Sequence, residues 1–342
     1  MLKNHRRSWG VLAALALLTL GGCNTRQEVL FTGKTMGTTY HITVITGFFN
    51  RAPGLAAKIE ERLEQINASM SVYRADSEIS RFNALAQSGE PFPISPDFMQ
   101  VMVVAENLHR LTGGAWDGTV APLVDLWGFG SKTNDKRVPT AAEIARCRAT
   151  LGFDQILVSE DGYLVKRNPA VTLDLGSIAK GYGVDQIAEL IRANGFADFL
   201  VEIGGEVFAA GLRRDGKQWR VGINRPDPAS PPDAVYKVLT LQEKALATSG
   251  DYRNFFEVDG VHYAHVIDPQ TGYPVANGVV SASVVSDTCT FADGLATALM
   301  VMGPGPGFAL VDRLEATECL IVVRQKDGRL TEFVSDGFSS TD

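Results

Sequence analysis

The chain has 342 residues, of which 45% are hydrophobic, and a formal net charge of −7 at pH 7. This length allows one large domain or two smaller ones. The chain is acidic and has no block of basic residues, which argues against a nucleic-acid partner. Its four cysteines are too few for a disulfide framework, although one disulfide bond is possible.

The first segment of the chain has the order of a bacterial export signal. Three basic residues lie within the first seven positions, and the apolar stretch 11–20 that follows is too short to span a bilayer. Next comes Leu18-Thr-Leu-Gly-Gly-Cys23, in which small residues precede a cysteine, as in a lipobox. We therefore predict that residues 1–22 are removed and that Cys23 is acylated, with palmitate among its chains. The alternative is an ordinary signal peptide with an incidental cysteine.

The mature chain is predicted to consist of a tether over residues 23–28 and one domain over residues 29–337. It has about 320 residues and a net charge near −10, because the leader carries three basic and no acidic residues. A polyanionic ligand would therefore need local compensation by a metal or a lysine. Several acyl chains would hold the domain stably at a membrane surface.

Apolar residues at helical or alternating spacing predict a mixed succession of helices and strands. Helices are predicted over 54–70, 95–111, 140–151, 177–194, 288–301 and 308–314. Strands are predicted over 29–46, 199–211, 219–224, 235–241, 245–258 and 278–286, and hairpins over 153–166 and 319–334. Gly303-Pro-Gly-Pro-Gly307 is expected to stop the helix before it. Helices and strands are interspersed without regular βαβ alternation, so we predict the α+β class.

The segment Asp174-Leu-Gly-Ser-Ile-Ala-Lys-Gly-Tyr182 follows a short strand over 171–173 and opens the helix that ends near Asn194. The N-terminus of a helix favours an anion such as phosphate, and Lys180 would meet that anion as a point charge. The segment lacks the Gly-x-x-x-x-Gly-Lys-Ser/Thr pattern, so it is not a P-loop. The competing interpretation is a capped helix with an exposed lysine.

A second polar pair lies in Asp293-Gly-Leu-Ala-Thr297, on a helix that is otherwise apolar. Asp293 and Thr297 are four residues apart and therefore share one helix face. A carboxylate in such surroundings is costly unless it is paired or metal-bound, and Mg²⁺ combines a few protein oxygens with water and phosphate oxygens. We therefore predict a Mg²⁺ site for a phosphate-bearing ligand. The alternative is an aspartate favoured by the helix dipole in the first turn.

His265 and Asp268 flank a strong turn signal, Asp268-Pro-Gln-Thr-Gly272. A histidine near neutral pH is the usual general base, and loop positions often carry catalytic residues. Both residues are therefore candidate bases. The alternative is a histidine at a strand end that bonds only to the backbone.

These motifs, in this order and spacing, resemble those of the ApbE family of FAD:protein FMN transferases. The resemblance extends from about residue 31 to about residue 335. It is carried by Met36-Gly-Thr38, Tyr73-Arg74, Ser77-Glu-Ile-Ser-Arg-Phe-Asn83, Gly113-Gly-Ala-Trp-Asp117, Pro122-Leu-Val-Asp-Leu-Trp-Gly-Phe-Gly130, 174–182, Gly204-Gly205, Thr248-Ser-Gly-Asp-Tyr252, His265-Val-Ile-Asp-Pro-Gln-Thr-Gly272 and Ala292-Asp-Gly-Leu-Ala-Thr-Ala298. It implies the family's T-fold-related architecture of mixed sheet and helix.

The resemblance also implies roles for single residues. The residues expected to contact FAD are Met36, Tyr73, Ala115, Trp116, Asp117, Asp174, Lys180 and Ile267. The residues expected to bind Mg²⁺ are Asp293, Thr297 and Ser177, the last through its backbone carbonyl.

The implied activity is transfer of FMN from FAD to a Ser or Thr hydroxyl of an acceptor protein, with release of AMP. The family's acceptors include membrane redox-pump subunits, and the lipid anchor implies the periplasmic face of a bacterial membrane. The inner membrane is favoured, and the outer membrane stays open. Two other functions compete with this one: an FAD pyrophosphatase that gives FMN and AMP, and a non-catalytic FAD-binding lipoprotein.

Overall fold

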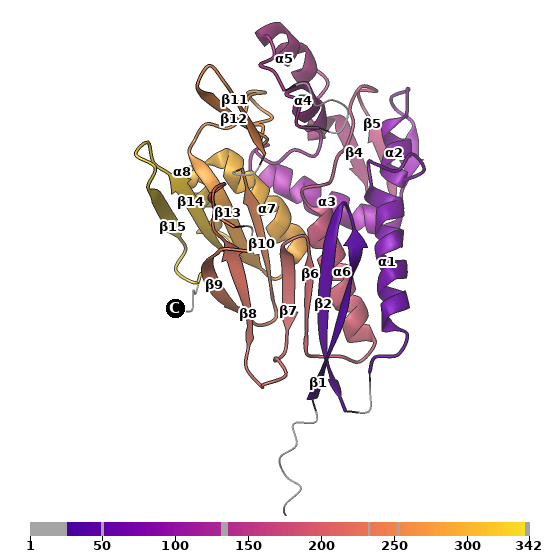
Figure 1. The fold of residues 1–342 in the computed structure, drawn as a ribbon. Helices are drawn as coiled ribbons and strands as arrows, with labels where there is room; N and C mark the ends of the chain where they lie inside the picture. The colour runs from indigo at the N-terminus through magenta and orange to yellow at the C-terminus, as the bar shows by residue number, and fades with distance from the viewer. Residues whose placement is uncertain (1–25, 49–50, 131–135, 232, 252–253, 339–342) are drawn as a thin grey trace, which may run out of the picture.

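The computed structural model describes residues 26–48, 51–130, 136–231, 233–251 and 254–338 (Figure 1). The leader, Cys23 and the beginning of the tether lie outside these residues. The predicted tether over 23–28 extends too far, because Arg26 is already the first residue of strand β1 and pairs with Gly47 of the neighbouring strand. The Arg26 guanidinium also forms an ion pair with Asp198, which fixes the start of the strand.

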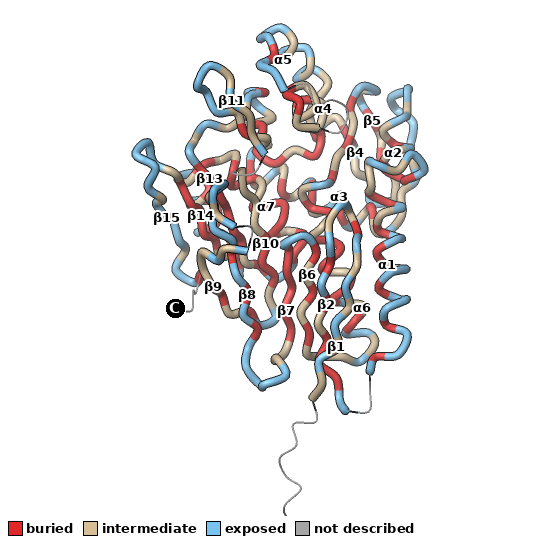
Figure 2. The backbone as a smooth tube through the Cα atoms, in the orientation of Figure 1, coloured by how far each residue is buried: buried red, intermediate tan, exposed pale blue. Residues whose placement is uncertain are grey.

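The fold is built on an eight-stranded antiparallel sheet in the order β1-β2-β6-β7-β10-β13-β14-β15. Its strands are β1 (Arg26–Thr35), β2 (Thr38–Gly47), β6 (Phe199–Ile203), β7 (Glu206–Ala210), β10 (Lys244–Gly250), β13 (Val279–Ser286), β14 (Glu318–Arg324) and β15 (Leu330–Val334). The central strands are buried, which makes the sheet the middle of the molecule (Figure 2).

The turn between β1 and β2 explains the first glycine-rich motif. Met36 and Gly37 both have positive φ, 49° and 74°, as a two-residue hairpin turn with the twist of its strands requires. Gly33 does not interrupt β1. A Cβ at that position would lie 2.6 Å from the ring of Tyr40 on the paired strand, so glycine lets this ring pack flat.

Helices cover one face of the sheet. The long ones are α1 (Leu55–Met70), α3 (Pro96–Leu111), α6 (Ala179–Ala193) and α7 (Cys289–Met302), and the short ones are α2 (Glu78–Asn83) and α8 (Pro304–Val311). Apolar side chains of α6 and α7 pack directly on the central strands, and α1 and α3 form the outer layer (Figures 1 and 2). This is the α+β arrangement that the sequence predicts.

Two smaller sheets complete the body. The hairpin of β8 (Trp219–Asn224) and β9 (Val235–Leu241) packs on the other face of the large sheet. A three-stranded sheet of β3 (Pro91–Pro93), β5 (Tyr163–Lys166) and β4 (Ile156–Ser159) lies near α2, next to the short 3-10 helix Phe153–Gln155. Among the helices that the structure describes, none combines the length and apolar character that crossing a bilayer requires.

One end of the sheet carries a separate subdomain, called the cap here and drawn at the top of Figure 1. It comprises α4 (Ala121–Leu126), α5 (Ala141–Arg148), β11 (Phe255–Val258) and β12 (Val261–Ala264). The cap has its own small core around Trp127 and Ile267. The indole of Trp127 donates to the Gly272 carbonyl at 2.9 Å, which ties α4 to the turn after His265.

The observed elements differ from the predicted ones in several places. The predicted strand 199–211 is two paired strands, β6 and β7, separated by the Gly204-Gly205 turn, and residues 171–173, predicted as a strand, form none. The predicted strand 245–258 is two strands of different sheets, because the chain leaves the large sheet after Gly250 to build the cap. Helix α8 begins at Pro304, not at residue 308: Gly303 ends α7 with a φ of 79°, and proline then takes the first helical position. The short helices α2 and α4 were not predicted, because their few turns carry little periodicity.

Candidate active site

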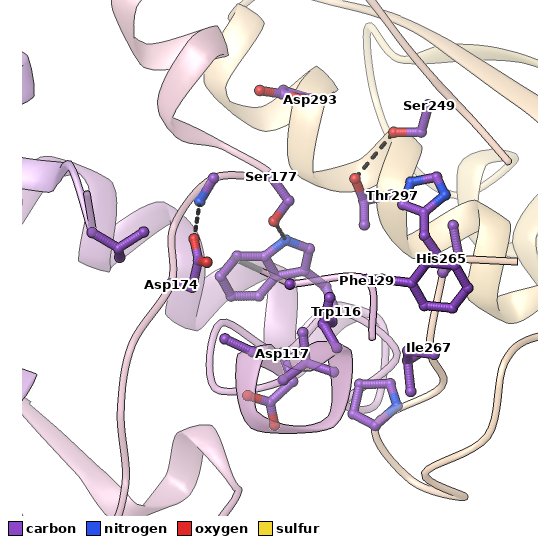
Figure 3. A pocket seen from close by; sticks show the side chains of 18 of the residues that line it. Trp116, Asp117, Phe129, Asp174, Ser177, Ser249, His265, Ile267, Asp293 and Thr297 are labelled. Carbon is purple, nitrogen blue, oxygen red and sulfur yellow. Dashed lines mark hydrogen bonds between the residues drawn. The ribbon is translucent and has the colours of Figure 1, made fainter. Parts of the chain in front are cut away.

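A cavity of about 840 Å³ lies between the cap and the helical face of the sheet (Figure 3). Eleven of the thirteen catalytic, FAD-contacting and metal-binding residues predicted from the sequence line it: Tyr73, Ala115, Trp116, Asp117, Asp174, Ser177, Lys180, His265, Ile267, Asp293 and Thr297. Met36 and Asp268 are not among the lining residues. Segments far apart in the sequence therefore meet at one place.

The loop before α6 is shaped by two sets of hydrogen bonds. The Asp174 carboxylate accepts from the Gly176 amide at 2.8 Å, and the Asp174 amide donates to the Gly118 carbonyl at 2.7 Å. The side chain of Asn83 binds both backbone groups of Leu173, at 2.7 and 2.8 Å. These bonds fix the direction in which the chain enters the helix.

Helices α6 and α7 approach each other unusually closely at the N-terminal turn of each. A Cβ on Gly181 would lie 2.3 Å from the Cys289 carbonyl oxygen, so only glycine fits. The Asp185 carboxylate of α6 accepts from the amides of Cys289 and Thr290, both at 2.8 Å, and thereby caps α7. Burial raises the pKa of Asp185, and the bonds from Thr290 and Cys289 oppose this rise.

This close approach places the Asp293 carboxylate at the start of α6. The Gly181 amide donates to Asp293 Oδ2 at 3.0 Å. In a regular α-helix that amide would donate to the Ser177 carbonyl, four residues earlier. Among the described residues no hydrogen bond to the Ser177 carbonyl is formed, while the Ser177 hydroxyl accepts from the Trp116 indole at 3.0 Å (Figure 3).

Two buried carboxylates share one lysine in the floor of the cavity. Lys180 Nζ lies 3.1 Å from Glu206 Oε2 and 3.5 Å from Asp293 Oδ1, and both carboxylates are only 4% exposed. Burial alone would lower the pKa of Lys180, but Asp293 and Glu206 outweigh it and raise that pKa. Burial, and then the charge of Asp293, raise the pKa of Glu206 to about 8. Burial also raises the pKa of Asp293, against the effect of Lys180 and the Gly181 amide.

The residues around Asp293 fit a magnesium ion. Asp293, Thr297 and the Ser177 carbonyl offer one carboxylate, one hydroxyl and one unbonded carbonyl, a set of hard oxygen donors that leaves coordination positions for phosphate and water. The Thr297 hydroxyl is 3.0 Å from that of Ser249 on β10, which orients it toward the cavity (Figure 3). Among the described residues, no group of three or more His, Cys, Asp or Glu side chains could hold a metal ion, so a site here would depend on hydroxyl and carbonyl oxygens beside the Asp293 carboxylate.

His265 lines the cavity beside the ring of Phe129 (Figure 3). Its Nδ1 lies 3.3 Å from the Asn254 carbonyl oxygen. Because a carbonyl only accepts, this contact assigns the proton to Nδ1 and leaves the lone pair on Nε2. Burial, with a smaller contribution from Lys136, lowers the pKa of His265 below its usual value of 6.5. The side chain is therefore a neutral imidazole at pH 7, as a general base must be.

The structure separates the two candidate bases. Asp268 Oδ1 accepts from the Gln270 amide at 2.8 Å and so closes the turn that follows His265. The Asp268 side chain serves the turn and does not line the cavity, whereas His265 does. The structure therefore favours His265 for any role in proton transfer.

The residues expected to contact FAD lie in several different surroundings. Tyr73 is 81% exposed at the rim, Trp116 is 1% exposed in the wall, and Ile267 packs in the core of the cap. The Asp117 carboxylate accepts from the Thr119 amide and hydroxyl, so it stabilises its own loop. Met36 is in the β1–β2 turn, where its side chain packs near Gly183 on α6.

Several polar residues that line the cavity have no role predicted from the sequence, among them Asn83, Glu206 and Ser249. Asn83 and Ser249 were part of the quoted motifs, but no role was assigned to them. Glu206 follows the Gly204-Gly205 turn directly and is the first residue of a buried strand. A charged residue at such a position is the sequence signal that could predict its place in the site.

Three comparisons place the chain among known proteins. Residues 36–321 match the model of the ApbE family. A FAD:protein FMN transferase of Vibrio cholerae is 43% identical over 97% of this chain and 98% of its own length, and one of Haemophilus influenzae is 39% identical over 94% of each. The solved flavin transferase ApbE of Vibrio cholerae superposes with a TM-score of 0.83 at 42% identity, and covers 92% of this chain and 98% of its own.

Proposed function

Because the chain belongs to the ApbE family, we propose that it is a flavin transferase that joins the FMN half of FAD to acceptor proteins. The reaction replaces the bond between the FMN phosphorus and the AMP oxygen by a bond from that phosphorus to an acceptor hydroxyl. AMP leaves, and the hydroxyl proton passes to a base. The acceptor residue is a serine or threonine.

The observation that carries this proposal is that a charged floor and a histidine base line one cavity. In the floor of the cavity, the Lys180 ammonium can bind a pyrophosphate oxygen directly, and the Asp293 carboxylate can hold a cation that binds one. His265, which lines the same cavity, supplies a lone pair. A dinucleotide bound between them would present its pyrophosphate to the floor and one phosphorus to an incoming hydroxyl.

His265 is the proposed base. Its Nδ1–H is oriented by the Asn254 carbonyl, and its Nε2 is free to take the proton of the acceptor hydroxyl. The neutral form needed for this step prevails at pH 7, because burial lowers the pKa of the ring. Asp268 contributes by closing the turn that carries His265.

Magnesium is the proposed metal, held by Asp293, Thr297 and the Ser177 carbonyl. When bound there, it would neutralise the charge that develops on the phosphate oxygens. Lys180 would hold a phosphate oxygen from the same side. The proposed contacts to the rest of FAD are Met36, Tyr73, 115–117, Asp174 and Ile267, of which Met36 would have to act from outside the cavity lining.

The site lies in a protein that we propose to be lipid-anchored on the periplasmic face of the membrane, through Cys23. The order of the basic leader, the short apolar stretch and the lipobox supports this proposal. Membrane redox-pump subunits are the proposed acceptors, because they would share that surface.

Product stoichiometry tests the function against an FAD pyrophosphatase, which would use water at the same phosphorus. The full chain is incubated with FAD, Mg²⁺ and an acceptor, and free AMP, free FMN and acceptor-bound flavin are measured together. A transferase yields one bound flavin for each AMP and little free FMN. Equal AMP and free FMN with an unlabelled acceptor would establish the pyrophosphatase, and no AMP at all would establish an FAD-binding protein.

A further inference from the structure

Glu206 has no part in the family resemblance, yet it is a buried charge next to the proposed cation site. It is the first residue of β7, and its side chain is 4% exposed. Its Oε2 atom is buried without an aligned hydrogen bond, although Lys180 Nζ lies 3.1 Å away. The contact is therefore an ion pair that leaves one carboxylate oxygen incompletely satisfied.

The ammonium of Lys180 is held from several sides. Glu206 lies at 3.1 Å, Asp293 at 3.5 Å, and the stem of the lysine packs on Gly204, where a Cβ would come within 3.3 Å of Lys180 Cδ. Lys180 in this position already neutralises the Asp293 carboxylate. A divalent cation that binds Asp293 must therefore compete with that ammonium and then tolerate it nearby.

Counting charges shows what Glu206 adds. Two buried carboxylates and one ammonium leave the floor with one unbalanced negative charge when both acids are ionised. Without Glu206 the floor would be a balanced Lys180–Asp293 pair, which holds no surplus charge for a cation. With Glu206 present, the Lys180 ammonium remains ion-paired when Asp293 binds the metal, so no buried charge is unpaired.

We propose that Glu206 is a positioning residue of the cation site: it keeps Lys180 paired when a divalent cation takes over Asp293, and so it determines how readily that cation binds. This inference rests on the proposed magnesium site. It also assigns Lys180 two partners in succession, Asp293 in the metal-free protein and a phosphate oxygen of the substrate in the loaded one, with Glu206 in contact throughout.

The test measures Mn²⁺ binding to the detergent-solubilised full chain without FAD, by the loss of the electron paramagnetic resonance signal of free Mn²⁺. The buffer is held well above pH 8, because burial and the charge of Asp293 raise the pKa of Glu206 to about 8. Glu206→Gln keeps the shape and removes the charge, so Lys180 pairs with Asp293 alone and the Mn²⁺ affinity falls by about tenfold or more. Lys180→Met removes the competing ammonium and raises the affinity.

The double variant distinguishes positioning from direct ligation. If Glu206 acts through Lys180, then Glu206→Gln in the Lys180→Met background changes the affinity by about twofold or less. An equal loss in both backgrounds would make Glu206 a metal ligand and overturn the inference. Unchanged Mn²⁺ affinity in Glu206→Gln would overturn it as well.

Two controls keep the outcome decisive. Glu202→Gln removes the same charge from the same β6–β7 hairpin, but Glu202 pairs with His41 and does not line the cavity, so its Mn²⁺ affinity should equal that of the wild type. Thermal unfolding monitors the fold of every variant. If Glu206→Gln does not fold, Lys180→Met decides alone: higher affinity supports the competition, and unchanged affinity contradicts it. Absence of Mn²⁺ binding by the wild type would remove the cation site itself, whereas product stoichiometry tests the transferase separately.

Discussion

The backbone amide of Gly181 donates a hydrogen bond of 3.0 Å to Asp293 Oδ2, across the interface between α6 and α7. One bond thus joins the two motifs that lie 112 residues apart in the chain. It draws the amide away from the Ser177 carbonyl, which is then free to bind a cation. The steric requirement for glycine and the proposed metal site are two consequences of the same contact.

Replacement of Gly181 by alanine is predicted to disrupt this interface. The new Cβ would lie 2.3 Å from the Cys289 carbonyl oxygen, a backbone atom that cannot rotate away. We expect a loss of about 3 kcal/mol in the free energy of unfolding, measured by urea denaturation. Gly305→Ala is the matched control, because nothing lies within 4 Å of its Cβ, and it should be neutral or slightly stabilising. Equal stability of both variants would contradict the packing described here.

Asp293→Asn is predicted to spare the fold and remove the metal. The amide oxygen can still accept from Gly181, and the variant no longer buries a charge, so the unfolding free energy should stay within about 1 kcal/mol of the wild type. Loss of the cation should cost about 3–4 kcal/mol of transition-state stabilisation, or ~10²–10³ in rate. Thermal unfolding with and without Mg²⁺ provides the check: the wild type should gain stability and the variant should not. Wild-type turnover that survives chelation by EDTA would remove the metal from the mechanism.

The acid limb of the pH–rate profile is predicted to belong to His265. The reaction needs the neutral ring, so the rate falls as the pH drops through the pKa of this residue. Burial lowers that pKa, which places the limb below pH 6.5. His265→Ala should slow acceptor labelling by ~10²–10⁴ and abolish the limb. A limb above pH 6.5, or one that persists in the variant, would assign it to another group.

Cys23→Ser is predicted to release the protein from the membrane fraction. The substitution removes the thiol that carries the acyl chains, while the domain begins at Arg26 and should fold unchanged. Mass spectrometry of the N-terminal peptide checks the modification, and fractionation checks the location. A wild-type protein without acyl mass on Cys23 would make this leader an ordinary signal peptide.

Local signals were sufficient to predict several elements. Helices α3 and α5 follow serine or threonine caps, Ser95 and Thr140, and the latter forms a full capping box with Glu143. Gly176 and Gly195 mark the two ends of the segment that predicts α6, and the apolar segment 288–301 predicts α7. The short helices α2 and α4 are not predicted, since six residues are too few to define a period.

The sequence predicts the site residues that lie in one motif, but not the contacts between residues that only the fold brings together. Asp293 and Thr297 share a helix face by spacing, which the structure bears out as a common lining of one cavity. The contact of Glu206 with Lys180 depends on how β7 lies beside α6, which no spacing reveals. Likewise, the sequence offers both His265 and Asp268 as candidate bases, and only the cavity lining and the bond from the Gln270 amide to Asp268 separate them.

The most direct test of the central claim is the intact mass of an acceptor protein after incubation with the full chain, FAD and Mg²⁺. The account predicts that the acceptor gains the mass of FMN less one water, on a single serine or threonine, with AMP released. Replacing that residue by alanine should abolish the gain, because alanine offers no hydroxyl, and Asp293→Asn in the enzyme should slow the gain by ~10²–10³. An acceptor that stays at its original mass while FAD is consumed, across several membrane redox subunits, would contradict the claim that this protein is a flavin transferase.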